Sequence, residues 1–324
     1  MKILVVGAGG QVGAKVARAA HRNGDTVVGT YRSRAPEEPG IEGLLLDKTD
    51  SSRVEAVFRR VRPDVVIDTG ALHNVDYCES HAEEAVAVNR DGTRLLAGAS
   101  RVVGARFVFV STDYVFDGFR EGPYSERDPV HPQSVYARSK LEGEQAAMSE
   151  NPDTVIARPS VVYSWVPLTA PTESASGKPL NFASWFLRQA LDGKEVRIVT
   201  DQVASPTLAE DLAGALLALA KSKSTGVFHT AGATPLSRYE FCRRLSERFG
   251  LPSEKVVPTS SSALRQAAPR PRNSSLTSER LRQELGYAMQ EIGPALDAMQ
   301  RSMEQDSELP SRLRSADHPG AVQP

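Results

Sequence analysis

Cysteine and tryptophan are scarce in this chain, with two of each among its 324 residues. Two cysteines, Cys78 and Cys242, cannot supply the disulfide framework of a small secreted domain, so a reducing compartment is expected. The apolar start of the sequence, ILVV, is interrupted by glycine too early for a signal-peptide core or a membrane span. We therefore expect a cytoplasmic chain with no membrane partner.

An excess of charge of either sign is also missing. The chain has 39 Lys and Arg against 40 Asp and Glu, a net charge of −1, and this balance gives no indication of a nucleic-acid partner. Hydrophobic residues make up 40% of the sequence, enough in a chain of this length to bury a large core without covalent crosslinks.

The first half of the sequence alternates apolar runs with helical patterns. Such an alternation indicates a parallel sheet covered by helices on both faces, a doubly wound α/β fold of the Rossmann type. The predicted strands are 2–6, 26–31, 44–46, 64–68, 106–110 and 154–157, and the predicted helices are 11–22, 51–61, 83–103 and 135–148.

After about residue 160 the pattern changes. We predict a dinucleotide-binding Rossmann domain over residues 1–160 and a smaller mixed α/β substrate lobe over residues 161–300, with a return to the sheet around residues 196–211. In this half the predicted helices are 181–191, 210–220, 237–249 and 278–285, and the predicted strand is 225–230. Residues 301–324 are polar and without periodicity, so a disordered tail is expected there.

The tail makes a first prediction. Cutting the chain after about Met303 should leave folding intact, because residues without an apolar period have nothing to pack with. A large drop in the melting temperature of the shortened chain would show that the tail docks, and a second subunit would then be a candidate partner.

Glycines mark the junction between the first strand and the first helix. Gly7, Gly10 and Gly13 form a GxxGxxG turn, in which the first glycine allows the tight turn and the second a close approach of pyrophosphate. The third lets the helix pack on the sheet, and the helix N-terminus offers N–H groups to the phosphates. An ordinary tight turn is the alternative, but the position after the first parallel strand favours a dinucleotide site.

The end of the second predicted strand lacks the acid that usually binds the ribose 2′-hydroxyl of NAD. Arg32 and Arg34 stand there instead, and a guanidinium suits the 2′-phosphate of NADP by charge and by its forked donors. We therefore expect NADP(H) to be preferred. Two solvated loop arginines are the alternative interpretation.

A tyrosine and a lysine lie one helical turn apart at the start of the helix predicted over 135–148. Tyr136 and Lys140 share one face, and an ammonium there can lower the pKa of the phenol and so help it exchange a proton with a carbonyl oxygen. Thr112 follows the fifth strand, where a hydroxyl faces the ligand crevice and can hold that oxygen. Ser111 is a competing candidate for this role.

Several segments resemble the extended short-chain dehydrogenases/reductases, and within them the dTDP-4-dehydrorhamnose reductase family. The matching segments are GAGGQVG, VSTDYVFDG, VYARSKLEGE, NFASWFLRQAL, VTDQVASPTLAEDLA and RPRNSSL, spread over residues 1–300. The resemblance implies reduction of the 4-keto group of a nucleotide-linked deoxysugar, with NAD(H) tolerated beside NADP(H). It also implies catalysis by Thr112, Tyr136 and Lys140, and cofactor contacts at Gly10, Gln11, Val12, Asp47 and Ala71.

The chain departs from that family at several points. Val161 stands where the reductases often have tryptophan beside the sugar nucleotide, and Lys15 stands where some relatives have a glutamate for a metal-linked dimer. We therefore expect no metal site, and a homodimer is left open. The segment 164–180 is longer than usual in the family and borders the expected substrate site.

Two other functions share these motifs. One is a non-catalytic, NADP-binding regulatory protein resembling the β subunit of methionine adenosyltransferase, to which RPRNSSL is equally similar. The other is a nucleotide-sugar epimerase or dehydratase with tightly held NAD, for which Asp113 beside Thr112 keeps a place. Turnover of a carbonyl substrate distinguishes the first from a reductase, and cofactor retained through purification indicates the second.

Overall fold

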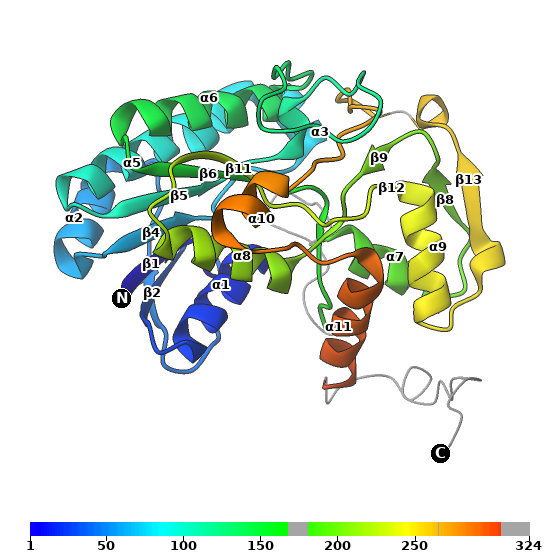
Figure 1. The fold of residues 1–324 in the computed structure, drawn as a ribbon, viewed down its shortest axis with the longest axis horizontal. Helices are drawn as coiled ribbons and strands as arrows, with labels where there is room; N and C mark the ends of the chain where they lie inside the picture. The colour runs from blue at the N-terminus through cyan, green and yellow to red at the C-terminus, as the bar shows by residue number, and fades with distance from the viewer. Residues whose placement is uncertain (168–180, 265, 306–324) are drawn as a thin grey trace.

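A seven-stranded, all-parallel sheet forms the centre of the computed structural model, which describes residues 1–167, 181–264 and 266–305. The strand order is β11-β6-β5-β4-β1-β2-β3 (Figure 1). The chain adds β2 and β3 on one side of β1 and then crosses to add β4 and the later strands on the other side, as in a doubly wound Rossmann fold. Its members are β1 (Lys2–Val6), β2 (Thr26–Tyr31), β3 (Glu42–Leu45), β4 (Val65–Asp68), β5 (Arg106–Val110), β6 (Thr154–Arg158) and β11 (Gly226–His229). The predicted fold class is confirmed.

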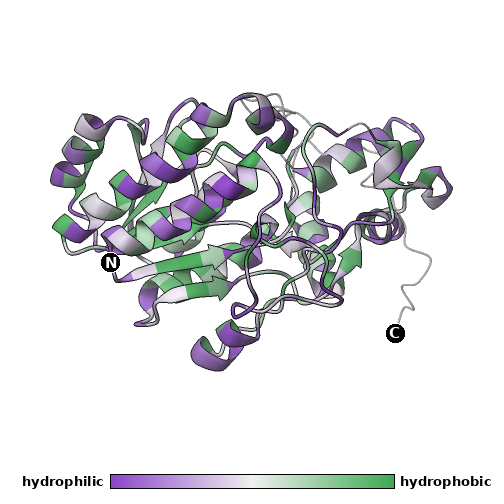
Figure 2. Ribbon diagram, turned by 90° about the horizontal axis from the view of Figure 1, so that it is seen from above, coloured by the Kyte–Doolittle hydropathy of each residue, from purple (hydrophilic) through white to green (hydrophobic). Residues whose placement is uncertain are grey.

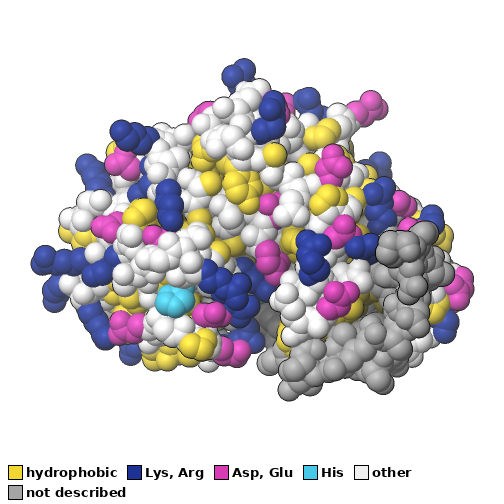
Figure 3. Space-filling view, turned by 60° about the horizontal axis from the view of Figure 1, so that its bottom comes forward, with side chains coloured by type: hydrophobic (Ala, Val, Ile, Leu, Met, Phe, Trp, Pro, Cys, Tyr) yellow, Lys and Arg dark blue, Asp and Glu magenta, His cyan; other side chains and the backbone are white. Residues whose placement is uncertain are grey.

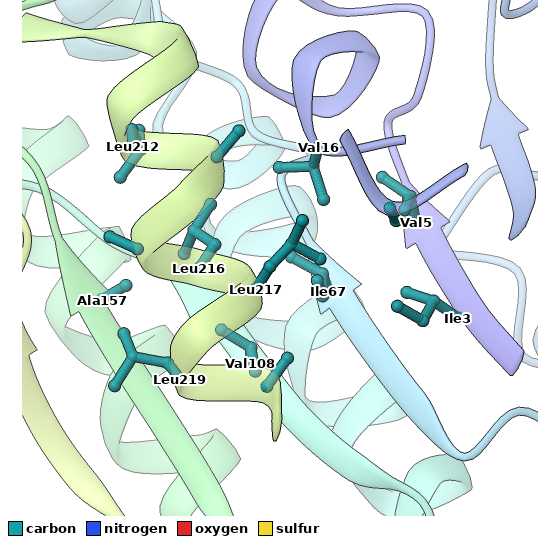
Figure 4. Packing of buried hydrophobic residues seen from close by; sticks show 14 of the residues in the cluster. Ile3, Val5, Val16, Ile67, Val108, Ala157, Leu212, Leu216, Leu217 and Leu219 are labelled. Carbon is teal, nitrogen blue, oxygen red and sulfur yellow. The ribbon is translucent and has the colours of Figure 1, made fainter. Parts of the chain in front are cut away.

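Helices cover both faces of this sheet. One face carries α1 (Gln11–Arg22), α8 (Ala209–Lys221) and α10 (Glu279–Leu285), and α1 and α8 pack closely together over the strands (Figures 1 and 4). The other face carries α2 (Ser51–Val61), α5 (Gly92–Val102) and α6 (Val135–Glu150). Both strand faces are thus buried, and every residue of β4 and β6 is buried.

The predicted long helix 83–103 is interrupted. It consists of α4 (Ala82–Val86), a π-helical turn η1 (Ala87–Asp91) and α5, and it is preceded by a short helix α3 (Val75–Ser80) that the periodicity did not predict. The π turn directs the side chain of Asn89 inward, where it donates to the Leu72 carbonyl at 3.0 Å and accepts from the Leu72 N–H at 2.9 Å. Asn89 also donates to the Ser139 hydroxyl at 3.0 Å, so it ties the loop after β4 to α6.

The second lobe has a core of its own. It packs α7 (Phe182–Leu191), α9 (Arg238–Arg248) and α11 (Ile292–Glu304) against β8 (Val196–Val199) and β13 (Val256–Thr259). Short pairs β7 (Val162–Tyr163) with β10 (Thr207–Leu208), and β9 (Val203–Ala204) with β12 (Leu236–Ser237), connect it to the sheet. Figure 2 shows the apolar residues gathered on the inner sides of both lobes.

Two predictions for this half are corrected. Residues 196–211 do not return to the central sheet, because β8 pairs in parallel with β13 in a separate two-stranded sheet, and β11 is the strand that returns. The expected tail starts later than predicted, because α11 continues to Glu304 and buries Met299 and Met303 in the second core. A truncation that tests the tail should therefore follow Gln305, and residues 306–324 lie outside the described part.

Surface charge agrees with the balanced composition. Lys and Arg alternate with Asp and Glu over the face seen in Figure 3. Of the helices within residues 1–167, 181–264 and 266–305, none combines the length and the apolar character needed to cross a membrane.

Candidate active site

The glycine turn between β1 and α1 is held by close backbone contacts. Gly7 has a φ of 81° and accepts the N–H of Gly10 at 2.9 Å. A Cβ on Gly13 would lie 2.2 Å from the Gly7 carbonyl oxygen, so this helix can approach the turn only with glycine there. Gly10 caps α1 without a side-chain hydrogen bond, which leaves the first N–H groups of the helix for an anionic ligand.

We expect Gly13→Ala to weaken dinucleotide binding about 5- to 150-fold, because overpacking a tight contact costs about 1–3 kcal/mol. Fluorescence titration with NADPH measures this change. Gly98→Ala in α5 is the matched control, since a Cβ there meets nothing closer than a Glu150 carboxylate oxygen at 3.7 Å. Equal affinity of the Gly13 variant and wild type would contradict the role given to this turn.

A fourth glycine, which the motif did not single out, connects the turn to the arginines after β2. A Cβ on Gly9 would lie 1.9 Å from the Arg34 carbonyl oxygen, and the Arg34 guanidinium donates to the Gly9 carbonyl at 3.1 and 2.7 Å. Arg34 therefore braces the glycine turn. Arg32 is exposed, and its charge lies near Asp47.

The other expected cofactor residues lie around this crevice. Asp47 accepts the N–H and the hydroxyl of Thr49 at 3.0 and 2.8 Å; burial opposes ionisation, but these bonds and Arg32 together lower the pKa of the carboxyl. Gln11 donates from Nε2 to the Ser164 hydroxyl at 3.2 Å, which links the turn to the segment leading to the second lobe. Val12 is half-buried against the sheet core, and Ala71 follows the end of β4, the strand beside β1.

Thr112 and Tyr136 meet at the carboxyl end of β5. Burial has the largest effect on the pKa of Tyr136 and raises it above its usual value, whereas the neighbouring Thr112 hydroxyl lowers it. Thr112 also accepts the N–H of Tyr114 at 3.2 Å. The competing candidate, Ser111, donates instead to Glu144 at 2.5 Å, so its hydroxyl is engaged away from Tyr136.

Lys140 lies one turn beyond Tyr136 on α6. Its ammonium donates to the Val110 carbonyl at 2.7 Å and lies 3.9 Å from the centroid of the Phe109 ring. Burial, followed by the charge of Lys48, lowers the pKa of Lys140 to about 7. The structure thus brings the three residues predicted for catalysis to one edge of the sheet.

Asp113 is bound to the second lobe. Its buried carboxyl accepts the hydroxyls of Ser160 at 2.8 Å and Ser274 at 2.6 Å, in addition to that of Thr112 at 3.2 Å. Burial raises the pKa of this carboxyl. Ser274 belongs to RPRNSSL, so part of that motif's function in this chain is to fix the residue beside Thr112.

Other charged candidates have partners within the chain. Arg270, the first residue of RPRNSSL, donates two hydrogen bonds to the carboxylate of Asp76 in α3, at 2.9 and 2.5 Å. Lys15 on α1 pairs with Glu210 on α8 at 2.7 Å. The absence of a metal-linked dimer therefore stays a prediction, but Lys15 has a role inside the subunit.

Two buried groups near the site carry no sequence signal that we used. Lys48 and Asp68 form an ion pair at 2.6 Å, and Asn89 ties the loop after β4 to α6. Lys48 follows β3 without a helical or alternating pattern around it, and its contact with Asp68 at the end of β4 is a tertiary one that local sequence does not indicate.

The parallel sheet, the glycine turn at its first crossover and the tyrosine–lysine pair define an extended short-chain dehydrogenase/reductase fold and site. Within that class, the model of the family described as RmlD substrate binding domain matches residues 1–305, and the chain belongs to this family.

Named relatives agree with the family. The chain is 36% identical over 319 residues to a dTDP-4-dehydrorhamnose reductase of Mycobacterium tuberculosis, covering 96% of this chain and 97% of that protein. A crystal structure of a dTDP-4-dehydrorhamnose reductase from Clostridium acetobutylicum superposes with a TM-score of 0.79 at 30% identity over 94% of this chain and all of that one. A Bacillus anthracis reductase in complex with NADP gives 0.79 at 28% identity, covering 93% and 99%.

Proposed function

We propose that this chain is an NADPH-preferring reductase of the 4-keto group of a dTDP-linked deoxysugar, with dTDP-4-dehydrorhamnose as the first candidate substrate. The observation that carries the proposal is the meeting of Thr112, Tyr136 and Lys140 at the sheet edge that also holds the glycine turn. The relatives that match nearly the whole chain bear the name of this activity.

The residues present fit a dinucleotide. The turn is a cradle in which backbone contacts exclude side chains at Gly9 and Gly13, and the helix N–H groups behind it suit a pyrophosphate. We assign the cofactor contacts to this turn and to the side chains around it, namely Gly7, Gly10, Gln11, Val12, Arg32, Asp47, Ala71, Tyr136 and Lys140.

Bound NADPH supplies a hydride to the carbonyl carbon. Thr112 then orients the carbonyl oxygen, and the phenol of Tyr136 gives that oxygen a proton. Burial raises the pKa of Tyr136, so the residue is held as a phenol, the form that donates. Lys140, whose ammonium donates to the Val110 carbonyl, would bind the ribose and, when charged, would stabilise the phenolate that remains.

Turnover tests the proposal directly. The chain is incubated with dTDP-4-dehydrorhamnose and NADPH, the loss of nicotinamide absorbance is followed, and the product is checked by mass for the gain of two hydrogens. Oxidation of NADPH with that product supports a reductase. NADPH binding without turnover of any 4-keto sugar would favour the regulatory alternative.

Asp113 bears on the dehydratase alternative. A carboxyl that accepts three hydroxyls from Thr112, Ser160 and Ser274 has its oxygens engaged in joining the lobes. This favours a structural use of Asp113 over acid–base chemistry on the sugar. Purified chain that retains NAD and interconverts sugars without net oxidation of NADPH would favour the epimerase or dehydratase instead.

We expect NADPH to bind about 10- to 100-fold more tightly than NADH, because a charge-assisted hydrogen bond contributes roughly 1.5–3 kcal/mol. Arg32 is the better placed donor, since Arg34 is bound to Gly9. Titrating both cofactors against wild type and Arg32→Ala measures the preference, which should shrink in the variant while NADH affinity is retained. Equal dissociation constants in wild type would mean that Arg32 points to solvent.

The remaining partners follow from the same proposal. Two buried free cysteines and a balanced charge support a cytoplasmic enzyme that binds a nucleotide sugar and neither nucleic acid nor membrane. With Lys15 paired to Glu210, dialysis against a chelator should change neither turnover nor oligomeric state. A chelator-sensitive dimer, seen by size-exclusion chromatography, would contradict the absence of a metal link.

A further inference from the structure

A buried ion pair lies beneath the candidate site. The Lys48 ammonium donates to Asp68 at 2.6 Å, to the Gly70 carbonyl at 2.8 Å and to the Thr93 hydroxyl at 3.1 Å. The side chains of Lys48 and Asp68 are 7% and 0% exposed. Charges so deeply buried are retained only where their partners are well placed, so these bonds fix the position of the ammonium.

The backbone around Lys48 is shaped to admit its long side chain. A Cβ on Gly92, the first residue of α5, would lie 2.8 and 2.9 Å from the Lys48 Cγ and Cε atoms. Gly92 follows the π-helical turn directly, so the start of α5 and the stem of Lys48 occupy adjoining space. A side chain at residue 92 would displace the ammonium from Asp68.

Lys48 is also close to Lys140. The two ammonium nitrogens lie 5.9 and 3.9 Å from the centroid of the same Phe109 ring. Among charged groups, Lys48 opposes the charged form of Lys140, whereas Asp68 at the end of β4 and Glu144 on α6 favour it.

The other titratable groups nearby are already committed. Glu144 is paired with Arg158 of β6 at 2.6 Å, and Tyr136 on the same helix lies beside Thr112. Three charged groups act on Lys140, and one of them, Glu144, lies on the same helix. The other two, Lys48 and Asp68, lie outside that helix.

We propose that Lys48 is a positioning residue of the cofactor site: its ammonium holds the loop at residues 69–72 through the Gly70 carbonyl, and its charge, paired with Asp68, acts on the Lys140 ammonium beside the same Phe109 ring. The proposal rests on the proposed function in one respect, that Lys140 binds the ribose of NADPH.

Opposite substitutions should have opposite effects. Lys48→Met keeps the stem but removes a repulsion, so Lys140 stays charged to higher pH; Asp68→Asn removes an attraction, so Lys140 loses its proton at lower pH. Since a charged Lys140 is the better ribose donor, the pH at which NADPH binding weakens should rise in the first variant and fall in the second, each by about one unit, a tenfold change in proton affinity.

The experiment is fluorescence titration of NADPH on the full chain from about pH 4.5 to about pH 10. Lys48→Arg, which retains the charge, should keep the wild-type midpoint. Lys221→Met is the matched control, because that lysine pairs with Asp25 at 2.8 Å at the opposite edge of the sheet. A merely structural role would weaken binding at every pH without moving the midpoints apart.

Midpoints that move in the same direction, or not at all, would overturn the proposal. If either single variant fails to fold, the double variant Lys48→Met/Asp68→Asn is used, because it leaves no unpaired buried charge. It should bind NADPH several-fold more weakly than wild type, because the loop at residues 69–72 loses its hydrogen bond from Lys48. Wild-type affinity in the double variant would also overturn the proposal. Failure of the proposed function would look different from failure of this proposal. Wild type would then turn over no keto sugar, while the pH midpoints of NADPH binding in the two variants would still move apart.

Discussion

Tyr136→Phe is expected to lower turnover of the keto sugar by about 10²- to 10⁴-fold, the range that a positioned general acid contributes. The variant removes one oxygen atom, the donor that meets Thr112 at the carboxyl end of β5. The dissociation constant for NADPH should rise by no more than about 2- to 12-fold, because one hydrogen bond to the ribose contributes only about 0.5–1.5 kcal/mol net. Steady-state rates and fluorescence titration together give both values.

Tyr114→Phe is the matched control for this variant. The Tyr114 ring packs edge-on against Tyr136 with 6.4 Å between centroids, so it lies in the same surroundings. We expect the control to retain most of the wild-type rate. A Tyr136→Phe chain that retains most of its activity would remove the phenol from the mechanism, and a Tyr114 variant as damaged as Tyr136→Phe would indicate that packing, not proton transfer, is being measured.

The sequence suggested that Lys140 lowers the pKa of Tyr136. In the structure the largest effect on this pKa is burial, which raises it. In this arrangement the Lys140 ammonium bonds to the Val110 carbonyl, and burial raises the pKa of the phenol. That difference matters for direction. A phenol held protonated suits reduction, where the substrate oxygen takes a proton, better than the reverse oxidation, where the same group must start as phenolate.

Most of the central sheet could be predicted because its strands are buried on both faces. β1, β2 and β5 were predicted at their observed bounds, since each is dominated by apolar, β-branched or aromatic residues. The catalytic pair was predictable for a similar reason: a helix fixes the spacing of residues four apart, whatever surrounds it. Thr112 followed from the end of β5.

The second lobe was less predictable because its elements are short and pair across long distances. β8 is an apolar run like those of the main sheet, but its partner β13 lies about sixty residues later, and local sequence does not choose between the two sheets. The helix α11 was missed because polar residues between its buried methionines obscured the period. Lys48 and Asn89 were missed as site residues because their roles depend on burial and partners. Asp113 was considered only for acid–base chemistry, and its hydrogen bonds to Ser160 and Ser274 were not predicted.

Arg158→Met is expected to destabilise the fold by about 3–5 kcal/mol, a large share of the roughly 5–15 kcal/mol that holds a typical domain together. Arg158 donates to both carboxylate oxygens of Glu144 at 2.9 and 2.6 Å, with side chains only 5% and 1% exposed. Methionine fills similar space but leaves Glu144 buried and unpaired. A melting temperature lowered by roughly 6–10 °C would follow if each kcal/mol costs about 2 °C.

Two further variants separate charge from packing. Arg158→Met/Glu144→Gln removes the stranded carboxylate and keeps an acceptor for Ser111, so it should recover much of the lost stability. Arg120→Met breaks an exposed pair with Asp128 and should cost less than about 1 kcal/mol. If the double variant is as unstable as Arg158→Met, the loss of stability comes from packing around β6 and not from the unpaired Glu144 carboxylate. If it recovers, the ion pair behind Ser111 fixes β5 and α6 relative to one another, and with them Thr112 and Tyr136.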